Sequence, residues 1–70
     1  MKEVITITFG EDIGFVSKEF SSEQALKTIA NLKEKDLYIN GSFIEDYSSV
    51  TVEILKNASY ILVQKQLIGA

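Results

Sequence analysis

One amphipathic segment, beginning at Ser21, decides much of the architecture. Ser21 and Gln24 have the spacing of a capping box, in which each side chain satisfies a free backbone donor at a helix start. Apolar side chains then recur at helical spacing and form one stripe: Ala25, Leu26, Ile29, Ala30 and Leu32. The pattern ends around Asp36, and a helix of about thirteen residues is not stable alone in water. We therefore expect the stripe to pack as core against a sheet built from the rest of the chain.

The N-terminal segments predict a β-hairpin. Residues 2–9 alternate, with β-branched and aromatic side chains on one face and threonines on the other. Two glycines bracket a turn at 10–14. Residues 15–20 return as the second strand, with either Phe15 or Val16 facing inward.

The pair Asn40-Gly41 predicts a second, tighter hairpin. It is flanked by apolar residues on both sides, and a two-residue hairpin turn needs positive φ at both central positions, which Asn and Gly tolerate. In the strand before the turn, if Leu37 and Ile39 face inward, alternation places Tyr38 outward.

Two further segments complete the predicted sheet. After a polar loop, residues 50–55 alternate, with both valines and Ile54 on one face. Residues 60–66 form the last strand, in which Tyr60 and Leu62 face outward.

The order of these elements indicates an α+β fold over a single domain, residues 1–70. One helix covers one face of a mixed four- to five-stranded sheet. If the first and last strands pair in parallel at the centre of the sheet, the arrangement is the β-grasp.

The second half of the chain resembles the ubiquitin-like β-grasp proteins. Residues 37–46, LYINGSFIED, look like the third strand, glycine turn, short strand and acidic loop of ubiquitin. Residues 54–63, ILKNASYILV, are similar to the leucine, lysine, polar turn and terminal strand shared by ubiquitin and the bacterial sulfur carriers of thiamin and molybdopterin synthesis. The tail, residues 67–70, falls where those families carry their activated terminus.

Two features depart from that family. The chain ends in Gly69-Ala70 where the carriers end in Gly-Gly, so activation at Gly69 requires removal of Ala70. The strand-like residues 50–55 stand where ubiquitin has a turn and a short helical segment. They imply either an added strand or a different small ββαββ fold, such as that of the immunoglobulin-binding domains of protein G and protein L type.

Composition argues against several functions. The chain has no Cys, His or Arg, so the usual nucleophile–base pairs and soft-ligand zinc sites cannot be built, and we expect no enzyme, no cofactor and no metal. A net charge of −3 with seven scattered lysines argues against nucleic-acid binding. The longest apolar run, residues 60–63, is far shorter than the roughly 20 residues of a membrane helix. We expect no membrane association and, without a signal-like apolar core, a cytoplasmic protein.

The acidic pairs Glu11-Asp12 and Glu45-Asp46 lie in predicted turns, where carboxylates favour water and local hydrogen bonds. We expect both pairs to be solvated rather than catalytic.

Tyr38, Tyr60 and Leu62 are the candidate site. On neighbouring strands of a β-grasp sheet they form an exposed apolar and aromatic patch, and ubiquitin meets its partners with the corresponding sheet face. We therefore expect a small non-catalytic module that binds a partner protein through this face. One alternative is a ubiquitin-like modifier or sulfur carrier activated at Gly69 after loss of Ala70. Another is a homo-oligomer that associates through the sheet edge beside residues 50–55.

Overall fold

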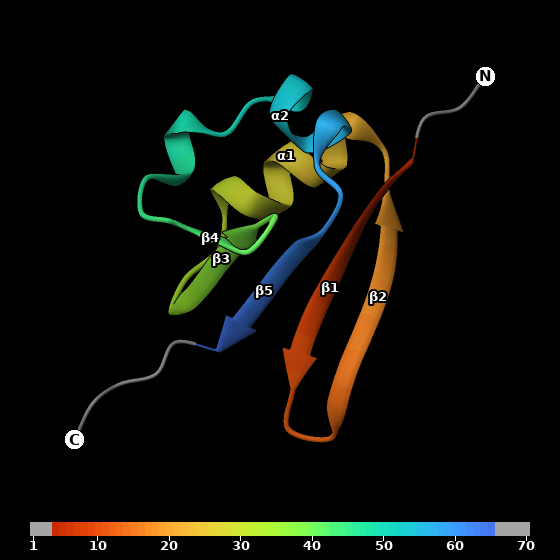
Figure 1. Ribbon diagram of the computed structural model, residues 1–70, viewed down its shortest axis with the longest axis vertical. Helices are drawn as coiled ribbons and strands as arrows, with labels where there is room; N and C mark the ends of the chain where they lie inside the picture. The colour runs from red at the N-terminus through yellow and green to blue at the C-terminus, as the bar shows by residue number, and fades with distance from the viewer. Residues whose placement is uncertain (1–3, 66–70) are drawn as a thin grey trace.

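The computed structural model describes residues 4–65, which form one α+β unit with a five-stranded mixed sheet (Figure 1). In chain order the elements are β1 (Ile5–Glu11), β2 (Gly14–Phe20), α1 (Ser22–Ala30), β3 (Lys35–Ile39), β4 (Ser42–Ile44), the 3₁₀-helix η1 (Tyr47–Ser49), α2 (Val52–Asn57) and β5 (Ile61–Lys65). The sheet order is β2-β1-β5-β3-β4. Only the central pair, β1 and β5, is parallel, and the other neighbouring strands are antiparallel.

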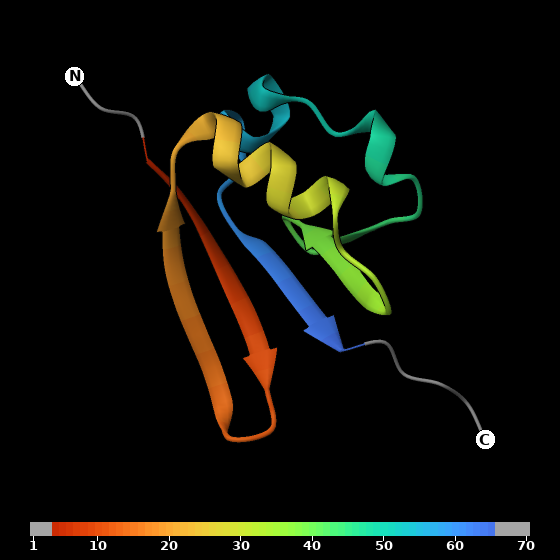
Figure 2. The same ribbon diagram turned by 180° about the vertical axis from the view of Figure 1, so that it is seen from behind.

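The core lies between α1 and the face of the sheet that α1 covers. Figure 2 shows α1 in front of this face, and Figure 1 shows the sheet from its other side. The buried apolar residues come from every layer: Ile5, Ile7, Ala25, Ile29, Leu37, Ile39, Val50, Leu55, Ile61 and Val63. The predicted inward positions of the first, third and last strands are thus confirmed.

Helix α1 begins where the sequence predicts. The Ser21 hydroxyl accepts a hydrogen bond from the backbone N–H of Gln24 at 3.2 Å, which confirms half of the capping box. The helix ends at Ala30, earlier than predicted, because Asn31 caps it: its side-chain amide donates to the carbonyl of Lys27 at 2.9 Å.

The apolar stripe of α1 is narrower than predicted. Ala25 and Ile29 are fully buried, whereas Leu26 and Leu32 are half-buried against the edge of the core. Ala30 is exposed, so its assignment to the buried stripe was wrong. A nine-residue helix has too few turns to bury a wide face, so only the residues that point directly at the sheet are fully buried.

Both hairpins form. Asn40 and Gly41 have φ of 53° and 83°, which confirms the tight turn between β3 and β4. In the first hairpin β1 continues through Gly10, and a two-residue turn leads into β2. The structure also shows which of the two candidates in β2 faces inward. Val16 lies on the side of α1 and is half-buried, whereas Phe15 lies on the other side and is 66% exposed.

Residues 50–55 do not form a strand, so that expectation was wrong. Thr51 caps helix α2, and its hydroxyl accepts from the N–H of Ile54 at 3.2 Å. Val50 and Leu55 are buried, while Ile54 is 43% exposed. Because burial of Leu55 beside α1 outweighs the β propensity of the two valines, the segment is helical. The edge strands of the sheet are β2 and β4, so the sheet edge expected beside residues 50–55 does not exist.

Paired truncations in α2 test this correction. Leu55→Ala removes a buried side chain and is expected to lower the free energy of unfolding by about 2–5 kcal/mol. Ile54→Ala, at the neighbouring exposed position, is the matched control and should cost less than about 1 kcal/mol. Urea denaturation measures both. A larger loss for Ile54→Ala would restore the strand interpretation, in which Ile54 faces the core.

Candidate functional site

The face of the sheet opposite α1, here called the open face, is the candidate site. Within residues 4–65 no helix lies over it (Figure 1). In each strand every second side chain points to this face, and the side chains next to them in sequence point toward α1 and form the core. The open face therefore collects the positions that the core does not use.

One row of side chains crosses all five strands of the open face. The pairing registers join Ser17 to Thr8, Thr8 to Leu62, Leu62 to Tyr38, and Tyr38 to Phe43. We call these five residues the cross-strand row. Tyr38 and Leu62, two of the three predicted site residues, are thus direct neighbours at its centre.

The row changes from polar to aromatic across the sheet. The hydroxyls of Thr8 and Ser17 share a hydrogen bond of 3.0 Å. At the other end the rings of Tyr38 and Phe43 have centroids 5.6 Å apart and are tilted by 54°, a favourable aromatic pair. Leu62 lies between these two ends, half-buried.

Phe43 also belongs to the candidate site, although the sequence did not lead us to expect it there. Its side chain is 51% exposed and completes the aromatic end of the row. The signal was present, because a two-residue turn at Asn40-Gly41 fixes the register and places Phe43 opposite Tyr38.

Phe15 extends the apolar surface beside the row. A Cβ built on Gly10 would come within 3.3 Å of the Phe15 ring and 3.2 Å of the Gln64 side chain. The ring therefore lies against the backbone of Gly10, and a side chain at position 10 would crowd it. Phe15 thus belongs to the open face as well.

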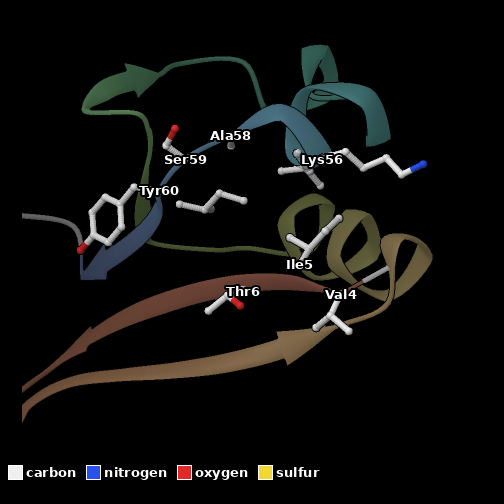
Figure 3. A pocket seen from close by; sticks show the side chains of 9 residues that line it. Val4, Ile5, Thr6, Lys56, Ala58, Ser59 and Tyr60 are labelled. Carbon is white, nitrogen blue, oxygen red and sulfur yellow. The ribbon is translucent and has the colours of Figure 1, made fainter. Parts of the chain in front are cut away.

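Tyr60, the third predicted site residue, stands at the rim of the open face rather than in the row. It precedes β5, is 48% exposed, and lines a cavity of about 240 Å³ between β1 and the segment that enters β5. Figure 3 shows this cavity with Tyr60 and Lys56 at its two ends and Thr6 on the β1 side. The structure therefore brings two of the three predicted residues together and places the third beside them.

The side chain of Asn40 fixes the position of Tyr60. Its oxygen accepts from the N–H of Ser59 at 2.7 Å and from the N–H of Tyr60 at 3.1 Å. The backbone N–H of Asn40 also donates to the Tyr60 carbonyl at 2.8 Å. The turn after β3 is thereby tied to the start of β5. Asn40 thus has two functions, since it also supplies the positive φ of the turn.

Residues of η1 hold the other end of β3. The Tyr47 hydroxyl donates to the carbonyl of Lys35. Burial, and then the negative charge of Asp36, raise the pKa of Tyr47 above its ordinary value, so the phenol stays a donor at neutral pH. Ser48 hydrogen bonds lower the pKa of Asp46, which caps η1.

The other predicted positions are the two acidic pairs and Gly69. Glu11, Asp12 and Glu45 are exposed at the ends of hairpins, as expected for solvated turns. Gly69, the predicted activated terminus, lies outside the described residues.

No family model, curated protein or solved structure matches this chain. None of the helices in the described part of the chain has the length and apolar character needed to cross a bilayer.

Removing the Asn40 side chain tests its role at the rim. Asn40→Gly keeps the positive φ but leaves the N–H groups of Ser59 and Tyr60 without their acceptor, which should cost about 1 kcal/mol. Asn40→Asp keeps an acceptor oxygen and serves as the control. Urea denaturation and amide hydrogen exchange at residues 59 and 60 measure the effect. Equal stability and equal exchange in the two variants would contradict this role.

Proposed function

We propose that this chain is a ubiquitin-like β-grasp domain that binds a partner protein, without catalysis, through Tyr38, Tyr60 and Leu62 on its open face. The strand order supports the proposal, because the first and last strands pair in parallel at the centre of the sheet. Helix α2 also supports it, since the resemblance to ubiquitin predicts a short helical segment at that place in the chain.

The observation that carries the functional part is the apolar and aromatic character of the open face. About half or more of the side-chain surface is exposed in Phe15, Phe43 and Tyr60. Tyr38 and Leu62, both half-buried, lie between them. A soluble domain seldom exposes a contiguous apolar surface unless another molecule covers it. Aromatic side chains are also the residues that most often anchor protein–protein contacts.

The contacts within the row favour binding over reaction. The Thr8 and Ser17 hydroxyls are hydrogen-bonded to each other, and the Tyr38 ring packs on Phe43. Such groups give shape and apolar area to an interface. They place no acid or base against a nucleophile in the row.

Two substitutions test the proposal. Leu62→Lys puts a charge at the centre of the row, and Tyr38→Ala removes its central ring. Each should reduce capture of the partner from a lysate of the native host by about tenfold or more, as expected for central contact residues. Quantitative mass spectrometry of proteins retained by the immobilised domain measures the loss.

Ile54→Lys is the matched control, because it places the same charge at an exposed apolar position on α2. It should leave capture unchanged, and circular dichroism should show all three variants folded. Capture that survives Leu62→Lys and Tyr38→Ala alike would rule out the open face as the binding surface.

A further inference from the structure

Charge is divided between the two faces of the sheet. By strand alternation and register, Lys18, Lys35 and Lys65 lie on the side of α1. Glu19 and Asp36, each next in sequence to one of these lysines, lie on the open face. The open face therefore carries carboxylates from its strands and none of their lysines.

These carboxylates flank the cross-strand row on opposite sides. Glu19 follows Ser17 by two positions on β2 and pairs with Thr6. Asp36 precedes Tyr38 by two positions on β3 and pairs with Gln64. Each lies about 7 Å from the row along its strand, because two strand residues span that length.

The three strand lysines, Lys18, Lys35 and Lys65, lie on the opposite face of the sheet from Glu19 and Asp36. The nearest lysine in sequence to Glu19 is directed elsewhere: the ammonium of Lys18 lies 5.6 Å from the centroid of the Phe9 ring, on the side of α1. Within the strands of residues 4–65, therefore, no lysine lies on the open face beside Glu19 or Asp36.

We propose that the open face binds a basic polypeptide segment, in which an apolar or aromatic anchor is flanked by lysine or arginine. This inference rests on the proposed function and adds the chemistry of the partner. The anchor packs on Leu62 and Tyr38, and the flanking cations reach Asp36 on one side and Glu19 on the other. Complementary charge steers such a partner to the face and fixes its orientation. Phosphate-rich partners such as nucleic acids or anionic lipids are repelled by the same carboxylates.

A pair of synthetic peptides tests the chemistry of the face. One alternates lysine with leucine and phenylalanine, and the other has glutamate in place of each lysine. Amide shifts of the ¹⁵N-labelled domain report binding. The basic peptide should shift the amides of Thr8, Leu62, Tyr38 and Phe43, and the acidic peptide should leave them in place. Equal shifts with both peptides, no shifts with the basic one, or shifts confined to α1 and α2 would overturn the proposal.

Neutralising the two carboxylates tests their part directly. Glu19→Gln with Asp36→Asn should weaken binding of the basic peptide by about threefold to tenfold, the range expected for two exposed ion pairs. The matched control is Glu23→Gln with Glu53→Gln, which makes the same change in net charge on α1 and α2. It should weaken binding far less. If both double variants weaken peptide binding equally, net charge alone explains the effect, and the proposal is overturned.

The failure of this inference is distinguishable from failure of the proposed function. Suppose that Leu62→Lys abolishes capture of a host protein, whereas the double variant Glu19→Gln with Asp36→Asn does not. If that capture is also unchanged between about 0.02 M and about 0.3 M salt, the open face binds a partner that is not basic. If Leu62→Lys changes neither capture nor peptide shifts, the face itself is not the site.

Discussion

The parallel pairing of β1 with β5 is the interaction on which the rest of the structure depends. It joins the first strand to the last at the centre of the sheet, through Thr8 opposite Leu62 and Phe9 opposite Val63. Without it the sheet would divide into the β1–β2 hairpin and a three-stranded sheet of β5, β3 and β4, and a two-stranded hairpin alone is only marginally stable. Closing so long a stretch of chain costs conformational entropy. Burial of apolar side chains from both strands beneath α1 offsets that cost.

The same pairing decides which side chains lie on the open face. Because the side-chain period of a strand is two residues, a shift of β5 by one position would bury Leu62 and expose Val63. The core then resists the shift, since Val63 is only 1% exposed beneath α1. The packing on one face of the sheet therefore fixes the composition of the other. Burial of Val63 in the core holds its neighbour Leu62 on the open face, between Thr8 and Tyr38.

Local signals predicted most of the fold, and tertiary contacts decided the rest. The Ser21 cap and the Asn40-Gly41 turn were predictable because each satisfies a backbone requirement within a few residues. Residues 50–55 were not, because a six-residue helix is too short to show a helical period, and two valines imitate a strand. What makes this segment helical is burial of Leu55 against elements distant in sequence. Of the candidate site, Phe43 was missed, although the turn geometry sets its register opposite Tyr38. The rim position of Tyr60 depends on the long-range hydrogen bonds of Asn40.

The charge of the open face shows why composition alone conceals such a surface. Along the chain, lysines and carboxylates lie close together, as in the adjacent pairs Lys18-Glu19 and Lys35-Asp36, so opposite charges are mixed in the sequence. A strand turns adjacency in sequence into separation in space, since neighbouring side chains point to opposite faces. Each pair thus contributes its lysine to the side of α1 and its carboxylate to the open face. A chain with well-mixed charges thereby forms a sheet with its strand lysines on the side of α1 and with Glu19 and Asp36 on the open face. The parity of each strand, rather than net charge, therefore determines the charge of the open face.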